Sequence, residues 1–420
     1  MAALAVEGAV TIDGDPVGLR AGDDGLIAEI GPGVVAAPGD QRIDGDGLAL
    51  LPGLVNGHTH AAMTLFRGFA DDLPLMEWLE DHIWPAEARL DAEDVYWGTR
   101  LACAEMIRTG TVRFWDMYWQ PGATARAAAD AGLRVTIGAP LIDGGDSGGL
   151  AKLRADAEAG FAEVAAVGSD LLSASLAPHA IYTVSDASLE WIAAEADRLG
   201  VPIQIHASET EGEVEGCLHA NGVRPIEHLD RLGLLGPRTL LAHSVWIDER
   251  ERELIAAAGA TVVTNPVANM KLAVGAAFDL PAAQRLGLPV GLGTDGAGSN
   301  NSLDLLADAK HLALLQKHSA ADAAAASAED VLAIATGAAA PLLGARPLEA
   351  GAPADFILVR TETPALGLGS LAAGLVYSAS GAVVDTTVVA GRVLMRGGVV
   401  DGEAEILERA RERAVRIGVR

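Results

Sequence analysis

Two histidines at alternate positions close an apolar run near the start of this 420-residue chain. The run covers residues 51–57, and His58 and His60 follow it. Side chains two residues apart on a strand point to the same side, so both imidazoles can reach one point. Neutral imidazoles bind zinc and other borderline metals. The spacing therefore indicates part of a metal site, although pairs of this kind also occur among ordinary core histidines.

Two more ligand-type residues end similar apolar runs, His206 after residues 201–205 and Asp295 after residues 290–294. Three histidines and one carboxylate, each closing a buried strand, predict a catalytic metal site, because structural zinc sites are dominated by cysteine. The chain has only Cys103 and Cys217 and no Cys-x-x-Cys motif. Two cysteines provide no disulfide framework, which fits a reducing compartment.

The chain is strongly acidic, with 57 acidic against 30 basic residues and a formal charge of −27. Nucleic acids and anionic membranes require a positive face, so neither is expected as a partner. Residues 1–8 lack the basic and long apolar regions of a signal peptide. The uncharged run 364–384 is interrupted by glycines and serines and has no basic flank, so no membrane span is expected. We expect a cytoplasmic protein.

The acidic excess has two explanations. Adaptation to a salt-rich cytoplasm is favoured, because salt screens the self-repulsion of the carboxylates. GC-rich codon usage is the alternative, although it does not by itself explain so large an excess. A halophilic protein should melt at a higher temperature in molar KCl than in dilute buffer. A melting temperature that is flat or higher at low salt would favour codon usage.

Short apolar runs alternate with longer alanine-rich segments of helical periodicity, such as residues 188–199 and 328–336, which predicts an α/β protein. The runs number eight, the strand count of a closed parallel (β/α)8 barrel of the TIM type, and we assign this barrel to residues 51–348. The eight runs are 49–56, 111–119, 134–142, 171–178, 202–207, 239–245, 260–264 and 289–293.

In such a barrel, catalytic groups lie at the carboxyl ends of the strands. Most candidate residues fall at or just beyond these ends: His58, His60, His179, His206, His243 and Asp295. The two ends of the chain differ from this pattern and consist of short β-like runs with glycine turns. Residues 1–50 and 349–420 are therefore predicted to form one composite β-sandwich domain, followed by a helix over about 403–415, because neither half alone could bury a core.

Several motifs resemble the amidohydrolase superfamily, in particular the ATZ/TRZ-type branch that deaminates 5′-methylthioadenosine and S-adenosylhomocysteine. The motifs are Pro52-Gly-Leu-Val-Asn-Gly-His-Thr-His60, Met76-Glu-Trp-Leu79, Ile83-Trp-Pro85, His206-Ala-Ser-Glu209, Ala242-His-Ser244, Asn265-Pro-Val-Ala-Asn-Met-Lys271 and Gly293-Thr-Asp-Gly-Ala-Gly-Ser-Asn300. The resemblance covers nearly the whole chain. It implies a metal-dependent hydrolase acting on C–N bonds of cyclic amidines, built as a barrel plus a composite β-sandwich. It also implies a homo-oligomer, a dimer or a tetramer.

The implied activity is deamination of an adenosine-type nucleoside: 5′-methylthioadenosine, adenosine, 5′-deoxyadenosine or S-adenosylhomocysteine. One divalent metal, zinc with ferrous iron as the alternative, would be held by His58, His60, His206 and Asp295 and would lower the pKa of water towards ~7. The carboxyl group of Glu209 would protonate the ring nitrogen beside the attacked carbon. Asp295 would carry a proton from water to the leaving ammonia. His243 would polarise the water, its alternative being a buried histidine bonded to backbone.

The resemblance also implies residues that bind the substrate. Glu87 would accept hydrogen bonds from the ribose hydroxyls, unless it is a solvated glutamate on a helix face. His179 would contact the substrate and Ser299 would lie near the base. Trp78 would pack against the purine, although tryptophan on an amphipathic helix more often belongs to the core.

The stretch after the third predicted strand indicates which 5′ groups are accepted. Members that use S-adenosylhomocysteine place arginines there, and an arginine fork suits a carboxylate. Here no arginine lies between Arg134 and Arg154, and Asp143 and Asp146 fall inside the stretch. We therefore expect uncharged 5′ groups to be preferred, unless a loop shift brings Arg154 into place.

Three other interpretations stay open. A two-metal amidase or imidase would need a carboxylated lysine, and Lys152 is the only lysine between His60 and His206. An aminohydrolase or chlorohydrolase of another heterocycle, such as guanine, cytosine or a triazine, would share the same catalytic core. A non-catalytic barrel that serves as a scaffold would have no reason to keep all these residues.

Overall fold

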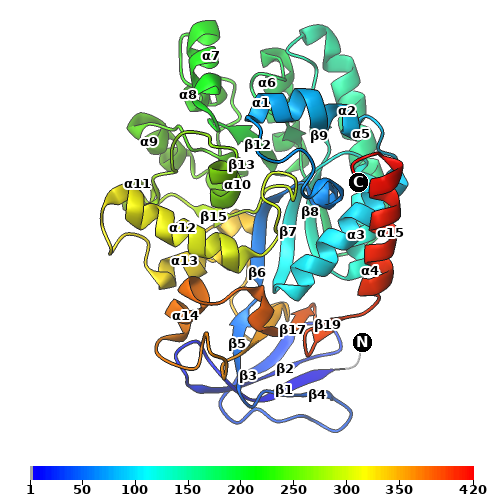
Figure 1. The fold of residues 1–420 in the computed structure, drawn as a ribbon, viewed down its shortest axis with the longest axis vertical. Coiled ribbons are helices and arrows are strands. Elements are labelled where there is room, and N and C mark those ends of the chain that lie inside the picture. The colour runs from blue at the N-terminus through cyan, green and yellow to red at the C-terminus, as the bar shows by residue number, and fades with distance from the viewer. Residues whose placement is uncertain (1–2) are drawn as a thin grey trace.

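The computed structural model describes residues 3–420 as an α/β body that stands on an antiparallel sheet (Figure 1). Parallel strands run through the α/β body in three sheets, and each of the eight apolar runs contains one of them or two consecutive ones. The sheets are β6 (Leu54–Thr59), β7 (Thr111–Met117), β8 (Arg134–Gly138) and β10 (Leu172–Ala174); β9 (Pro140–Leu141) and β11 (Ala177–Pro178); and β12 (Ile203–Ala207), β13 (Thr239–His243), β14 (Thr261–Thr264) and β15 (Val290–Leu292).

Contacts between strands join these sheets edge to edge. Leu176 pairs with Ile203, and Ala180 pairs with His206, both in parallel. At the other edge, the Asn56 amide contacts both the backbone N–H and the hydroxyl of Thr294, at 3.0 and 2.7 Å. The carboxyl ends of distant strands are thereby brought to one side of the body, where the predicted site residues are found.

Helices separate successive strands and cover the outside of the body. Residues 186–199 and 328–335, close to two segments predicted as helices, form α6 and α13. The helices of the body are α3 (Ala92–Arg108), α4 (Pro121–Ala131), α5 (Leu150–Ala166), α6 (Asp186–Leu199), α7 (Glu211–Asn221), α8 (Pro225–Arg231), α9 (Glu249–Ala258), α10 (Pro266–Lys271), α11 (Leu280–Arg285), α12 (Leu305–Ala320) and α13 (Ala328–Ala335). Short 3₁₀ turns cover Ala61–Phe66, Ser147–Gly149, Pro341–Leu343 and Gly381–Val383.

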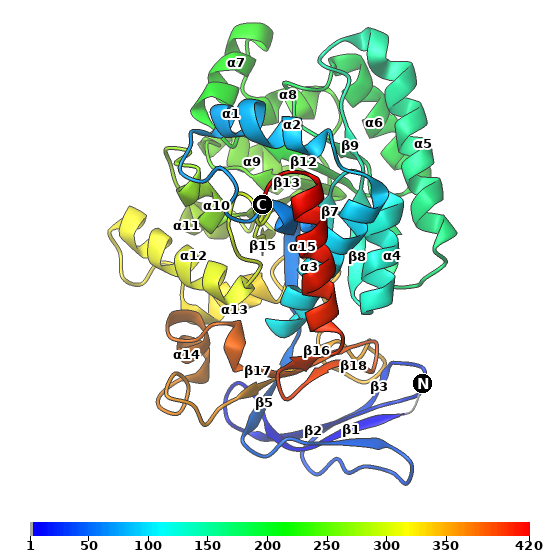
Figure 2. The same ribbon diagram turned by 45° about the vertical axis from the view of Figure 1, so that its right-hand side comes forward.

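Segments from both ends of the chain share the sheet at the base, in the order β19-β18-β17-β16-β5-β1-β2-β3 with β4 on β1. Its pairs are antiparallel, except that β1 runs parallel to β4 and to β5. Its strands are β1 (Leu4–Val10), β2 (Pro16–Ala21), β3 (Ile27–Gly31), β4 (Gln41–Asp44), β5 (Leu48–Pro52), β16 (Phe356–Arg360), β17 (Val384–Val389), β18 (Arg392–Arg396) and β19 (Val399–Val400). The helix α14 (Leu371–Tyr377) precedes β17. The last helix, α15 (Glu403–Arg416), lies along α3 (Figure 2) and forms ion pairs between Arg416 and Asp94 and between Arg108 and Glu403.

The first apolar run, 49–56, is divided between the two parts of the fold. Residues 48–52 pair with β16 in the antiparallel sheet, whereas residues 54–59 begin the parallel strands. The division falls at Gly53, where an added Cβ would lie 2.2 Å from a methyl carbon of Val112. Pro52 has no N–H to donate, which also suits a change of partner at this point.

A cover segment, residues 75–87, lies across the carboxyl ends of the parallel strands (Figures 1 and 2). It consists of α1 (Leu75–Glu77), a π-helix over Trp78–Ile83 and α2 (Trp84–Glu87). Turns of π-helix are rare and are frequently found at functional sites. No helix within residues 3–420 is both long enough and apolar enough to cross a membrane.

Candidate active site

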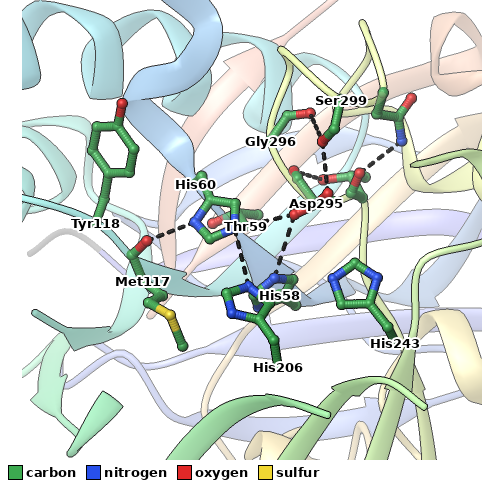
Figure 3. A network of polar contacts seen from close by, with 12 residues as sticks. His58, Thr59, His60, Met117, Tyr118, His206, His243, Asp295, Gly296 and Ser299 are labelled. Atoms are coloured by element: carbon green, nitrogen blue, oxygen red, sulfur yellow. Dashed lines mark hydrogen bonds and ion pairs between the residues drawn. The ribbon is translucent and has the colours of Figure 1, made fainter. Parts of the chain in front are cut away.

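Four side chains converge where the parallel strands end (Figure 3). His58 ends β6 with His60 just beyond, His206 lies on β12, and Asp295 follows β15 with a φ of 62°. The Asp295 carboxylate lies 3.4 Å from His58 Nε2 and 3.2 Å from His60 Nε2. His206 Nε2 is 3.3 Å from His60 Nε2. The alternation of residues along one strand and the shared edge of parallel strands thus place all four groups together.

The same groups carry buried polar atoms without partners. Both ring nitrogens of His58 and Oδ1 of Asp295 are buried and make no hydrogen bond. Such atoms are costly in a folded protein unless an ion or water satisfies them. His60 Nδ1 and His206 Nδ1 lie 2.6 and 2.8 Å from the carbonyl oxygens of Met117 and His179. In a neutral ring, donation to these carbonyls leaves Nε2 unprotonated and directed to the centre, so the donor set fits a divalent cation.

Electrostatics in this cluster also favour a cation. Burial lowers the pKa of His58 to about 4. Burial opposes the charged form of His60 as well, but the Asp295 carboxylate outweighs it and raises the pKa of His60 to about 9. Burial would raise the pKa of Asp295, yet its contacts with His58 and His60 hold it well below its usual value. A bound cation would compete with the proton on His60, so metal affinity should fall as the pH falls.

Two titratable side chains stand beside the cluster. Glu209 follows β12, and its Oε1 lies 3.7 Å from His243 Nδ1. Burial, the largest influence, raises the pKa of Glu209. His243 Nδ1 lies 2.8 Å from Asn269 Oδ1 on α10, so its hydrogen-bond partner is a side chain rather than backbone. A carboxyl group that holds its proton more readily and a fixed imidazole suit proton transfer.

Glu213 fixes the backbone that carries Glu209, a contact that the sequence reasoning missed. Its two carboxylate oxygens each accept a backbone N–H at 2.9 Å, one from Ser208 and one from Glu209. Ser208 has a φ of 51°, a left-handed conformation that needs such support. In the sequence, this contact is indicated only by the position of Glu213, four residues after Glu209 and in the first turn of α7.

The backbone around His58 and His60 is likewise held by a buried carboxylate. Asp116, at the end of β7, accepts the Ala61 N–H at 2.6 Å and the Thr59 hydroxyl at 3.1 Å. Burial raises its pKa to about 6. The sequence reasoning did not single out Asp116, because nothing within its own run distinguishes it from a core or surface aspartate.

A cavity of about 870 Å³, part of it open to solvent, lies above the cluster. It brings together every predicted site residue except His58, which is buried beneath it. The predicted residues along its wall are His60, Trp78, Glu87, His179, His206, Glu209, His243, Asp295 and Ser299. The Trp78 side chain is buried, so it belongs to the packing of the cover segment as well as to the cavity wall.

Glu87 faces this cavity and is anchored there. The Tyr118 hydroxyl donates to its Oε1 at 2.7 Å, and Trp119 Nε1 lies 3.5 Å from its Oε2. Burial, the largest influence, raises the pKa of Glu87. The Glu87–Tyr118 pair joins the cover segment to the end of β7, and Tyr118 was not predicted as a site residue.

His179 and Ser299 already have partners in the protein. His179 Nδ1 lies 3.0 Å from the Thr183 hydroxyl, and burial lowers the pKa of His179 to about 4, which keeps its ring neutral. The Ser299 hydroxyl donates to Asp295 Oδ2 at 2.6 Å. Ser299 therefore supports Asp295 in addition to lining the cavity.

The basic residues considered earlier lie elsewhere. Within residues 3–420, no lysine or arginine lines this cavity. The Arg154 guanidinium stacks over Trp191, 5.2 Å from the ring centre. Lys152 is exposed on α5 and pairs with Asp156, so it offers no bridge for two metals.

Comparison with known proteins shows the family to which the chain belongs. The model of the amidohydrolase family matches residues 49–394, and the chain belongs to this family. It is 46% identical to a 5′-deoxyadenosine deaminase of Methanoregula boonei, over 89% of this chain and 86% of that protein. It is 43% identical to 5-methylthioadenosine/S-adenosylhomocysteine deaminase 1 of Archaeoglobus fulgidus, over 93% of each. The predicted resemblance to the amidohydrolases and to their deaminase branch is confirmed.

Solved structures show the same architecture. An adenosine deaminase from Xanthomonas campestris with bound zinc superposes with a TM-score of 0.89 at 33% identity, over 99% of this chain and 98% of that one. An atrazine chlorohydrolase from Arthrobacter aurescens complexed with zinc gives a TM-score of 0.88 at 22% identity, over 98% of this chain and 100% of that one. The latter likeness shows the fold alone.

Proposed function

We propose that this amidohydrolase deaminates adenosine-type nucleosides, replacing the 6-amino group by oxygen to give the inosine derivative and ammonia. The proposal rests chiefly on Glu209 and His243, which lie 3.7 Å apart at the edge of the His/Asp cluster and line the cavity above it. Relatives at 40–46% identity named as 5′-deoxyadenosine and methylthioadenosine/S-adenosylhomocysteine deaminases support it.

One divalent metal per chain is part of the proposal, zinc with ferrous iron as the alternative. His58, His60, His206 and Asp295 would hold it, which would satisfy the buried atoms that have no partner. Histidine nitrogens and carboxylate oxygens are ligands that zinc accepts in catalytic sites. The bound metal supplies Lewis acidity, which makes water a stronger acid and a better nucleophile near neutral pH.

The protein side chains account for the proton transfers. Glu209 gives its proton to N1 of the purine as the water oxygen attacks C6. Asp295 accepts one proton of that water and passes it to the amine, so the C6–N bond breaks and ammonia leaves. The second water proton returns to the Glu209 carboxylate as the C6 carbonyl forms. His243, fixed by Asn269, orients the attacking water. Burial raises the pKa of Glu209, so its carboxyl group holds a proton more readily than an exposed glutamate does.

Replacing Glu87 by glutamine should weaken nucleoside binding, because we assign this carboxylate to the ribose hydroxyls. An amide forms weaker hydrogen bonds than a carboxylate, so KM for adenosine should rise by about tenfold. Metal content should stay unchanged, as should KM for free adenine. The matched control is Glu80→Gln, an exposed glutamate of the same cover segment. Equal losses for adenine and adenosine would argue against ribose recognition.

We propose that uncharged 5′ groups are preferred over the amino-acid tail of S-adenosylhomocysteine. The cavity wall offers no cation for a carboxylate, and Arg154 is engaged with Trp191. The Asp143 carboxylate does not face the cavity, because it accepts hydrogen bonds from the hydroxyl and the N–H of Ser185.

Steady-state kinetics on a panel of substrates test both the activity and this preference. The panel is adenosine, 5′-deoxyadenosine, 5′-methylthioadenosine and S-adenosylhomocysteine. The charged substrate should have a kcat/KM about tenfold or more below the best uncharged one, the effect of one missing charge-assisted contact. If S-adenosylhomocysteine is the best substrate, the preference is wrong. If none of the four releases ammonia, the proposed function is wrong.

We also propose how the parts are arranged. Residues 51–348 would form one closed (β/α)8 barrel, which is supported by the Asp295 N–H donating to the His58 carbonyl at 3.0 Å across the β15–β6 edge. Residues 1–50 with 349–420 would form the composite β-sandwich domain, supported by their shared sheet. A cytoplasmic dimer or tetramer remains a prediction, which light scattering on the purified protein would check.

A further inference from the structure

Lys271, the last residue of α10, binds three oxygen atoms from two other segments. Its ammonium group donates to Asp71 Oδ1 at 2.7 Å, to the Gly298 carbonyl at 2.8 Å and to Asn301 Oδ1 at 2.6 Å. The Asn301 amide in turn donates to Asp71 Oδ2 at 2.9 Å. The three N–H bonds of the ammonium group are therefore all used, and the side chain is mostly buried.

Both contacted segments border the active-site cavity. Asp71 lies four residues before the cover segment, which contributes Leu75, Trp78 and Glu87 to the cavity wall. Gly298 and Asn301 flank Ser299, whose hydroxyl binds Asp295. Lys271 therefore ties the entry of the cover segment to the loop that carries the Asp295–Ser299 pair.

The backbone that leads into the cover segment depends on contacts from other segments to keep its conformation. Ala70 and Asp72 have φ values of 55° and 65°, a left-handed conformation that is unfavourable for L-residues. Asp71 lies between them and is held by Lys271 and Asn301. External contacts are needed to keep a backbone in such a conformation.

A second cavity makes the position of this connection important. It has a volume of about 1960 Å³ including open solvent, and Asp72 and Lys271 are among its lining residues. Leu75, Tyr182, Glu209 and Leu272 line both this cavity and the active-site cavity. The wall shared by the two cavities thus includes Leu75, which follows the Asp71 contact, and Leu272, which follows Lys271.

We propose that Lys271 is a positioning residue that keeps the cover segment closed over the bound nucleoside. The proposal rests on the proposed function in so far as the ligand is a nucleoside. The Lys271–Asp71–Asn301 contacts fix the wall between the two cavities. Without them the cover segment opens towards the second cavity, and nucleoside binding weakens more than the chemical step, because neither Glu209 nor the His/Asp cluster touches Lys271.

Two variants test this link, Lys271→Met, which keeps most of the length of the side chain, and Asp71→Ala, which removes one of its three acceptors. Amide hydrogen exchange is measured on the metal-loaded full chain without substrate, followed by steady-state kinetics with adenosine. Exchange in residues 67–87 should be about tenfold faster in both variants. KM should rise about tenfold, kcat should stay within about threefold, and metal content should not change. The control is Lys152→Met, which removes an exposed lysine–aspartate pair on α5.

The double variant, which combines Lys271→Met with Asp71→Ala, shows whether the two substitutions act through one shared contact or independently. Its exchange rate and KM should stay within about twofold of those of Lys271→Met, because both substitutions break the same contact. Additive effects, or wild-type exchange and KM in the single variants, would overturn the proposal. Asp71→Ala keeps the test decisive if Lys271→Met does not fold. The exchange comparison needs no turnover, so a wild-type protein inactive on nucleosides would refute the proposed function and leave this result intact.

Discussion

Glu209→Gln is expected to lower kcat by about 10²–10⁴-fold, the contribution of a well-placed proton donor. Glutamine keeps the shape of the side chain but cannot hold and pass a proton. The substituted side chain stays buried next to His243, and Glu213 still fixes its backbone. Substrate affinity and metal content should therefore remain close to those of the wild type.

Ammonia release under substrate saturation measures this effect, and binding of the unreacted nucleoside is measured separately. Glu211→Gln, an exposed glutamate two residues further on, serves as the control and should have wild-type turnover. A Glu209→Gln enzyme that keeps more than about a tenth of wild-type kcat would disprove the assigned role.

Replacing both His58 and His60 by alanine is expected to remove the metal and reduce turnover by at least about a thousandfold. The two imidazoles are half of the four candidate ligands, and the remaining pair, His206 and Asp295, is too few to hold a catalytic cation tightly. Elemental analysis of the wild type should find about one divalent metal per chain.

The control for this experiment is His311→Ala, which removes an exposed histidine on α12 that bonds only to its own helix. This variant should retain its metal and its activity. Two metals per active chain, or full activity after loss of both His58 and His60, would falsify the proposed ligand set.

The sequence was informative where function follows a repeating backbone geometry. His58 and His60 were singled out because residues alternate along a strand, and His206 and Asp295 because parallel strands end on one side of a sheet. The structure brings these four together, within 3.2–3.4 Å for each measured pair. Periodicity of apolar residues likewise indicated α6 and α13 to within two residues at their N-terminal ends.

Side-chain contacts that come from separate segments of the chain could not be predicted in this way. Tyr118 contacts Glu87 across 31 positions of the chain, and Asn269 contacts His243 across 26. A local sequence pattern does not show which loops contact each other. The sequence therefore predicted Glu87 and His243 as site residues, but not the residues that hold them. The hydrogen bond from Ser299 to Asp295 could not be predicted either, because it depends on a loop conformation that composition does not specify.

The run 49–56 shows how a local pattern can conceal a change of partner. Its apolar character reflects burial on both sides of Gly53, but burial does not distinguish the antiparallel sheet from the parallel strands. Only the close approach of Gly53 to Val112 separates the two, and that contact is made by residues far apart in the sequence.

The pairing of β5 with β16 has a consequence for how the chain is made. A ribosome completes β5 at Pro52 and must add about 300 residues before Phe356 begins the strand that covers its edge. At 5–20 residues per second, that edge waits roughly 15–60 s for its partner. An uncovered edge strand is a site for pairing with other chains. A nascent chain stalled before β16 should therefore aggregate or recruit chaperones, even though the strands that carry the site residues have already been synthesised.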